Sequence, residues 1–251
     1  MLANRDLASG DNYAFAESGD KIYCLHCAGA GGWKNLMASV ENEEAAANNQ
    51  TAAGLSSRAW QTLGTDKKML IVLVDFSDLE GGVVNSDIAT ARANEVKNHL
   101  KTASYSKFDF GTIDIVPDVI RLPQTSAWYK DDGGGNERYR DLAVDARAIA
   151  NDTYEKDSND YHFFVIAFKD IYDGWSGRGS IGSWGGYKGF DSSVTWLNGS
   201  EMDSRVFAHE IGHNLGLWHA GSWEVPTSES QADASSGSHV EYGFYYDAMG
   251  T

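Results

Sequence analysis

Three histidines near the C-terminal end of this 251-residue chain have the spacing of metal ligands. His209 and His213 lie four residues apart, so a helix would place both imidazoles on one face, one turn apart. Gly216 can end that helix in a left-handed conformation, which would let the chain turn and return His219 as a third ligand. Three nitrogen ligands with one open position are typical of a catalytic zinc site rather than a closed structural site.

Glu210 directly follows the first of these histidines. A carboxylate in this place can take a proton from a water molecule that the metal activates. A surface helix that happens to be rich in histidine would explain the same residues. The chain has only 7 histidines, however, and three of them fall in one window of eleven residues. We therefore predict hydrolysis at a zinc ion, with Glu210 as general base and then general acid.

Apolar runs predict the strands of a sheet. Residues 69–75 (MLIVLVD) and 161–168 (YHFFVIAF) are nearly continuous apolar runs, which are typical of strands buried on both faces. Residues 111–120 alternate between apolar and polar, as a half-buried strand does. We expect two further short strands, near 180–184 and 193–197.

Helical spacing of apolar residues predicts two long helices, at about 86–102 and 137–154. A third helix, from about 203 to 215, would carry His209 and His213, with Ser200 or Asp203 as its N-cap. The order of strands and helices predicts an α+β fold, in which helices pack on a mixed, twisted sheet.

Composition and charge limit the partners of this chain. Hydrophobic residues make up 42% and aromatic residues 12%, which is enough for a substantial core. The formal net charge of -16 argues against nucleic acid or an anionic membrane surface as a partner. No run approaches the roughly 18 apolar residues that a membrane span needs. We expect a monomer by default, and the resemblance described below implies a protein or peptide as the partner.

Residues 1–65 differ from the rest of the chain, because they are polar and rich in glycine, alanine and asparagine. We place a domain boundary near Thr65, with an N-terminal extension at 1–65 and a catalytic domain at 66–251. The N-terminus lacks the basic segment and apolar run of a signal peptide. Either the protein is cytoplasmic, or the chain begins after its targeting segment. We favour a secreted protein, which the resemblance described next implies.

The pattern His-Glu-x-x-His-x-x-Gly-x-x-His at 209–219 resembles the signature of the metzincin zinc metalloproteases. Met249 lies 30 residues after His219 and resembles the methionine turn that these proteases have beneath the metal. Among the metzincins the chain is most similar to the gametolysin-like proteases. This resemblance covers roughly residues 66–250 and depends on three segments: 70–76, 207–220 and 241–250.

The resemblance implies a zinc endopeptidase, with a sheet subdomain above the cleft and a small C-terminal subdomain below it. In such proteases the substrate pairs with the lower edge strand of the sheet. The residues at that place in this chain are Gly179, Ser180, Ile181, Gly182 and Ser183. Their small side chains would let a peptide approach, although a glycine-rich loop without any ligand would look the same.

Cys24 and Cys27 are the two cysteines of the chain, and three interpretations stay open. We favour a small-loop disulfide, which suits a secreted protein. A thiolate that reaches the catalytic zinc would make 1–65 an inhibitory segment, as in some metzincin zymogens. A second metal site or a reactive pair is the third interpretation, but two cysteines alone provide too few ligands.

Two further roles have candidates in the sequence. Tyr242, Tyr245 and Tyr246 could each donate a hydrogen bond to the oxyanion of the reaction, and the sequence does not choose among them. Two acidic groups could hold calcium, although neither has the regular spacing of a calcium loop and we favour solvated acidic faces. These groups are Asp75, Asp78 and Glu80, and Asp170 with Asp173.

Two other classes of function compete with a protease. One is a catalytically inactive or latent binding module on a metzincin scaffold, in which the N-terminal segment blocks the cleft. The chain stops two residues after Met249, where metzincins continue into a C-terminal helix, so we expect a truncated or processed chain. The other is a redox or structural zinc protein built on Cys24 and Cys27, which explains little of the remaining sequence.

Overall fold

The computed structural model describes residues 15–18, 21–24, 64–131, 133–182, 187–224, 237–244 and 247–250. The chain divides into two compact units, Met1–Ser56 and Ser57–Thr251. In the first unit, strand β1 (Phe15–Ser18) pairs antiparallel with β2 (Lys21–Cys24). Cys24 ends β2, whereas Cys27 lies outside the described residues.

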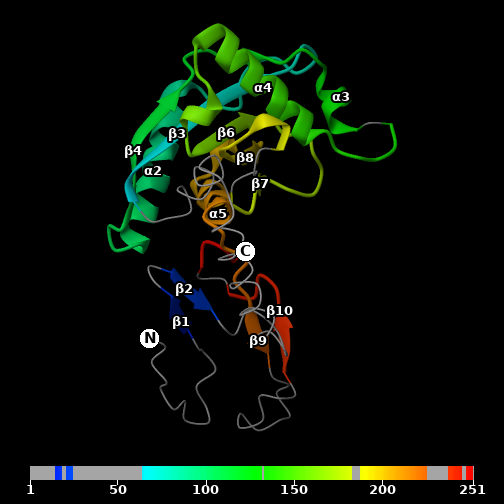
Figure 1. Ribbon diagram of the computed structural model, residues 1–251. Helices are drawn as coiled ribbons and strands as arrows, with labels where there is room; N and C mark the ends of the chain where they lie inside the picture. The colour runs from blue at the N-terminus through cyan, green and yellow to red at the C-terminus, as the bar shows by residue number, and fades with distance from the viewer. Residues whose placement is uncertain are drawn as a thin grey trace, which may run out of the picture. The chain divides into compact units, whose positions relative to one another are not determined.

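The second unit is built on a twisted sheet with strand order β4-β3-β6-β8-β7, in which β5 also pairs with β3 (Figure 1). All strand pairs are parallel except the last, because β7 (Gly177–Gly179) runs antiparallel to β8. The parallel strands are β3 (Gly64–Asp75), β4 (Phe108–Ile115), β5 (Ile120–Arg121), β6 (Phe163–Phe168) and β8 (Ser193–Asn198).

Helices cover both faces of this sheet. One core cluster joins alternate residues of β3, such as Val72, to α4 (Tyr139–Tyr154). The other cluster joins the intervening residues, such as Ile71, to α2 (Ser86–Ala103) and α5 (Ser204–Asn214). Successive side chains of a strand point to opposite faces, so residues 69–74 of β3 and all of β6, which are covered on both sides, are apolar at every position. Figure 1 shows α4 on one side of the sheet and α2 with α5 on the other.

Smaller elements complete the described part of this unit. Strands β9 (Ser222–Glu224) and β10 (Ser238–Val240) form an antiparallel pair after α5. The short helices are α3 (Ser126–Lys130), η4 (Ser158–Asp160), η5 (Tyr187–Gly189) and η6 (Ser200–Met202). None of the helices in the described ranges has both the length and the apolar character to cross a membrane.

The α+β fold with a mixed, twisted sheet and two long helices is confirmed. Two strands differ from their predicted positions. The segment at 111–120 divides into β4 and the two-residue β5. The short strand expected near 180–184 lies instead at Gly177–Gly179, and 183–186 are outside the described residues. Because glycine is rare in strands, a strand with glycine at both ends has only a weak signal in the sequence.

Candidate metal centre

Helix α5 positions the first two histidines and begins at a firm N-cap. The Asp203 side chain accepts hydrogen bonds from the backbone N–H groups of Arg205 at 2.9 Å and Val206 at 3.1 Å. Phe207 and Ile211, on the inner side of the helix, are fully buried in the core. His209 and His213 therefore lie one turn apart on another side, with ring centroids 4.7 Å apart.

The end of α5 directs the chain back toward these rings. Gly216 has φ +90°, so the left-handed conformation predicted for it is confirmed. Its N–H donates to the His213 carbonyl at 2.8 Å, and the Leu217 N–H donates to the Gly212 carbonyl at 3.0 Å. These two bonds form a Schellman motif, which satisfies carbonyls that the helix leaves free. Beyond it, His219 Nε2 lies 3.1 Å from His213 Nε2.

The three histidines form a donor set that suits zinc. One ligand nitrogen from each lies within 4.8 Å of the others, a convergence that no other trio of His, Cys, Asp or Glu shows among the described residues. Burial lowers the pKa of His209 and of His213, which favours the neutral imidazoles that bind metals.

Each imidazole is oriented by an oxygen atom at Nδ1. A ring nitrogen that contacts a carbonyl or carboxylate oxygen carries the proton, so Nε2 keeps its lone pair for a metal. Nothing in the spacing of the sequence marks these acceptors. The pairs are His209 with Ala248 O at 2.8 Å, His213 with Leu217 O at 2.8 Å, and His219 with Glu241 Oε1 at 2.6 Å.

Glu210 is buried beside the histidines, with only 5% of its surface exposed. Burial raises the pKa of its carboxyl to about 8, and the guanidinium of Arg178 opposes this shift. Its Oε2 has no hydrogen-bond partner among the residues that the structure describes. Without a metal, a pKa of about 8 keeps this carboxyl protonated at neutral pH. A cation held by the histidines would favour the ionised form, whose Oε2 could then accept a proton from water.

Strand β7 packs directly against Glu210. A Cβ atom built on Gly177 would lie 2.5 Å from Glu210 Oε1, and one built on Gly179 would lie 2.5 Å from the Glu210 carbonyl oxygen. Only glycine allows this approach, because real Cβ atoms essentially never come within 3.0 Å of another atom. These two glycines therefore fix the position of the edge strand over the helix. This role of Gly177 was not predicted from the sequence.

The residues after β7 bend toward α5. The Ser180 N–H donates to the Val194 carbonyl at 2.9 Å, and the Gly182 N–H donates to the His213 carbonyl at 3.0 Å. Ile181 between them is 43% exposed. Four of the five predicted substrate-binding residues thus lie next to the helix that carries the histidines, and Ser183 is outside the described residues.

Met249 lies beneath the helix and is 5% exposed. A Cβ atom on Gly212 would overlap the Met249 sulfur, so the sulfur contacts the backbone of α5 next to His213. The Met249 N–H donates to Asp247 Oδ1 at 2.8 Å, and the Met249 carbonyl accepts from Ala220 N–H at 2.8 Å. The turn at 247–250 thus contacts both ends of the segment that contains the histidines, through Ala248 O to His209 and through Met249 O to Ala220.

Tyr242 is the described member of the three tyrosines considered as oxyanion donors, since Tyr245 and Tyr246 lie outside the described residues. Its hydroxyl lies 2.6 Å from His219 Nε2, and the two ring centroids are 3.8 Å apart. Burial raises the pKa of Tyr242, and the carboxylates of Glu241 and Glu210 act in the same direction, so the hydroxyl keeps its proton.

The first group of predicted calcium ligands is bound within the chain. Asp75 forms a two-point ion pair with Arg121, with distances of 2.6 and 3.0 Å, and accepts from the Gly81 N–H at 2.7 Å. Asp78 accepts from the backbone and hydroxyl of Ser126 at 2.7 and 2.9 Å. These carboxylates fix loops to the sheet, and their geometry does not support a calcium site.

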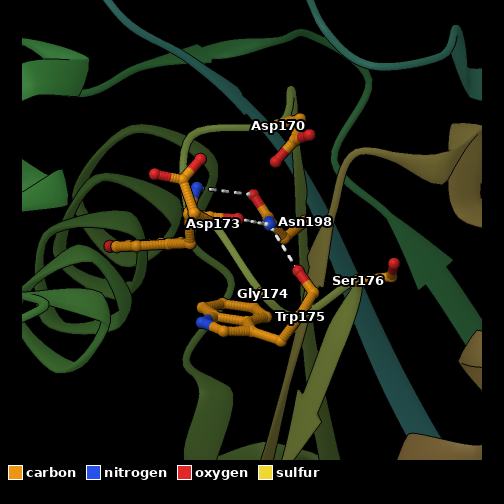
Figure 2. A pocket seen from close by; sticks show the side chains of 7 residues that line it. Asp170, Asp173, Gly174, Trp175, Ser176 and Asn198 are labelled. Atoms are coloured by element: carbon orange, nitrogen blue, oxygen red, sulfur yellow. Dashed lines mark hydrogen bonds between the residues drawn. The ribbon is translucent and has the colours of Figure 1, made fainter.

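The second acidic group lines an open pocket, shown in Figure 2 between Asp170 and Asp173. Lys130 pairs with Asp173 at 2.9 Å. The Asn198 side chain binds the backbone that surrounds the pocket, since its Nδ2 donates to the carbonyls of Tyr172 at 2.8 Å and Trp175 at 2.6 Å. Asp170 and Asp173 belong to no convergent trio of metal-binding side chains among the described residues, so this group does not support calcium either.

Comparison with known proteins identifies one match. Residues 93–220 match a family model described as metallo-peptidase family M12B, reprolysin-like. This segment is just over half of the chain and contains the three histidines and Glu210. No curated protein sequence matches the chain.

Proposed function

The chain belongs to the reprolysin-like M12B metallopeptidase family, and on this premise we propose that it is a zinc endopeptidase of the metzincin type. The observation that supports the proposal is the convergence of one ring nitrogen from each of three histidines, with the buried side chain of Glu210 next to His209 on the same helix. Within the metzincins we propose the gametolysin-like group, because of the resemblance at 207–220 and 241–250.

His209, His213 and His219 would hold the zinc through Nε2. Zinc in such a site lowers the pKa of a water molecule toward neutrality and polarises the scissile carbonyl. Glu210 accepts the proton of the attacking water and passes it to the nitrogen of the leaving amine. Met249 supports this arrangement from below as the methionine turn of the family, since its sulfur contacts α5 next to His213.

We propose that the substrate binds along β7 and the residues that follow it. One edge of β7 pairs with β8, and the described part of the chain places no strand on the other edge. A peptide in extended conformation could add there by main-chain hydrogen bonds. Gly179, Ser180, Ile181 and Gly182 would line this path, with Ser183 at its end. The absence of bulky side chains at most of these positions would allow close approach.

Residues 1–65 are proposed to be an N-terminal extension that acts as a pro-segment, and 66–251 the catalytic domain. Cys24 and Cys27 would form a disulfide in this extension or provide a thiolate that keeps the enzyme latent. An extracellular location suits both alternatives. A catalytically inactive binding module is less well supported, because all three histidines and Glu210 are present and an oxygen atom contacts Nδ1 of each histidine.

The decisive experiment is digestion of a library of peptides with blocked termini. We expect cleavage of internal bonds that a zinc chelator abolishes and added zinc restores. The Glu210→Gln variant should bind zinc as the wild type does and lose hydrolysis by at least about 100-fold. Near-wild-type cleavage by this variant, or cleavage that is insensitive to the chelator, would contradict the proposal.

A further inference from the structure

Tyr242 contacts the candidate zinc site from outside the matched segment. We propose that Tyr242 is a further catalytic residue, whose hydroxyl donates a hydrogen bond to the carbonyl oxygen of the scissile peptide bond. This role rests on the proposed function, because it requires a peptide carbonyl at the metal. It concerns the oxygen that gains negative charge, whereas Glu210 acts on the proton of the water.

The direction of the Tyr242 hydroxyl is determined by its partner. His219 Nδ1 donates to Glu241 Oε1 at 2.6 Å, so Nε2 of the same ring is an acceptor. The Tyr242 hydroxyl lies 2.6 Å from this Nε2 and must therefore donate to it. The O–H group thus points at the atom through which His219 would bind the metal.

The ring of Tyr242 is held in this position by packing. It packs against His219 with 3.8 Å between the ring centroids and a tilt of 31°, and it lies nearly parallel to His209 at 6.3 Å, with an angle of 15°. The turn after β10 fixes its backbone, because the Gly243 N–H donates to the Val240 carbonyl at 3.2 Å. The hydroxyl cannot move far from the histidines while these contacts persist.

The backbone of Tyr242 is strained. Its φ of +60° lies in the left-handed region, which costs a residue with a side chain about 1 kcal/mol or more. Such strain persists where the surrounding structure over-determines it, and it occurs often at functional sites. Here the conformation aims the phenol at the histidines.

Metal binding would leave the Tyr242 hydroxyl without its acceptor. If Nε2 of His219 held the metal, its lone pair would be used, while the phenol ring could stay packed against the imidazole. The O–H group is then free to donate to another oxygen next to the metal. A carbonyl oxygen that accumulates charge as water adds to the carbon is the acceptor that gains most from such a donor.

Arg178 is the described cation closest in sequence to the proposed substrate path, and it is engaged elsewhere. Its guanidinium packs over the rings of Tyr139 at 4.5 Å and Trp175 at 4.9 Å. It also pairs with Glu137 at 3.4 Å. Gly177 and Gly179 face α5, so the residue between them faces the opposite side of the sheet. Tyr242 is therefore the better candidate for the oxyanion donor.

The test compares Tyr242→Phe with Tyr154→Phe. Tyr242→Phe keeps the ring that packs against His219 and removes only the hydroxyl. Tyr154→Phe is the control, because it removes a hydroxyl that contacts Asp118 at 3.2 Å, away from the histidines. We expect both to bind one zinc per chain. Tyr242→Phe should lower kcat by about 100- to 1,000-fold, with KM changed only a few-fold, and Tyr154→Phe should match the wild type.

A binding measurement without turnover completes the test. A phosphinic peptide, which imitates the tetrahedral state, should bind Tyr242→Phe more weakly by the same factor as the loss in kcat. The product peptide should bind both variants and the wild type equally. Equal affinity of the phosphinic peptide for wild type and Tyr242→Phe would overturn the role of Tyr242. Loss of zinc from Tyr242→Phe would also overturn it, because the hydroxyl would then act in holding the site.

These outcomes separate the inference from the proposed function. If the wild type cleaves peptides and Tyr242→Phe keeps kcat within threefold, only the role of Tyr242 is wrong. If the zinc-loaded wild type cleaves no peptide, the proposed function fails. The phosphinic peptide then still decides whether the hydroxyl is the donor, since weaker binding to Tyr242→Phe alone supports it and equal binding excludes it.

Discussion

Glu241 and Tyr242 are neighbours in the sequence but act on opposite nitrogens of one imidazole. The carboxylate of Glu241 fixes Nδ1 of His219, and the hydroxyl of Tyr242 contacts Nε2. Side chains that orient metal ligands through the nitrogen remote from the metal commonly change metal affinity by about 10- to 100-fold when they are lost, and Glu241 is such a side chain. Tyr242 contacts the other nitrogen, so its loss should leave metal affinity unchanged.

Gly216 offers a separate test at the scale of one residue. A Cβ atom there would have no atom within 4 Å, so Gly216→Ala acts only through φ +90°. We expect it to lower the free energy of unfolding by about 1–2 kcal/mol and to weaken zinc binding, because the turn that returns His219 is strained. Chemical denaturation and zinc competition with a chelator would measure the two effects.

Gly174 provides a matched control for this substitution. It has φ +89°, and a Cβ atom there would also have no atom within 4 Å, but it lies in the loop of Figure 2 rather than in the turn that precedes His219. Gly174→Ala should lose similar stability without a change in zinc affinity. If both variants bound zinc equally well, Gly216 would have no specific role in positioning the third ligand.

At the scale of elements, α5 and β7 act as one unit. The helix carries two histidines and Glu210, and the strand rests on it through Gly177 and Gly179. Helix α5 was predictable, because its cap, its apolar spacing and its terminal glycine are all local signals. Strand β7 was placed three residues too late, since its two glycines serve contacts with a helix that lies about thirty residues further along the chain.

The packing of β7 on α5 predicts the effect of Gly177→Ala. Its Cβ would lie 2.5 Å from Glu210 Oε1 and 2.6 Å from Val206 Cγ1, so the strand or the helix must shift. Overpacking of this kind costs about 1–3 kcal/mol of stability. We also expect a loss of kcat, because Glu210 is displaced from its place beside the histidines.

The control is Gly64→Ala in β3, where the new Cβ would meet only side-chain atoms, at 3.3 Å or more. This variant should retain activity and most of its stability. Denaturation curves and peptide hydrolysis, measured on both variants, would separate a general intolerance of alanine in strands from a specific clash with Glu210. If Gly177→Ala kept the kcat of the wild type, the added Cβ would not displace Glu210, and this prediction would be wrong.

At the scale of the whole molecule, the buried sheet could be predicted and the polar contacts across it could not. Continuous apolar runs require two covered faces, which fixes β3 and β6 as central strands. The acceptors of His209 and His219 lie 39 and 22 residues away in the sequence, and the partners of Asp75 and Asp78 also come from other segments. Asp75 was interpreted as a calcium ligand or a solvated carboxylate, yet it binds Arg121, 46 residues further on.

This ion pair predicts how the stability of the molecule depends on pH. The hydrogen bond from Arg121 holds the pKa of Asp75 below its ordinary value, although burial alone would raise it. A carboxyl whose folded-state pKa is lowered stabilises the fold above its unfolded pKa of about 3.9. That contribution falls as the pH drops through the folded-state pKa. Asp75→Asn should therefore lower the free energy of unfolding by about 1–2 kcal/mol at pH 7.

The difference in unfolding free energy between wild type and Asp75→Asn should stay constant from pH 7 to about pH 5 and shrink below about pH 4. Comparing the two proteins removes the pH dependence of the histidines and of zinc binding, which both share. Asp160→Asn, at an exposed position in η4, serves as the control for loss of one carboxylate. Urea denaturation at each pH measures the difference. A gap between wild type and Asp75→Asn that persists unchanged to about pH 2 would mean that the side chain stabilises β3 by its shape and hydrogen bonds, and that its charge contributes nothing.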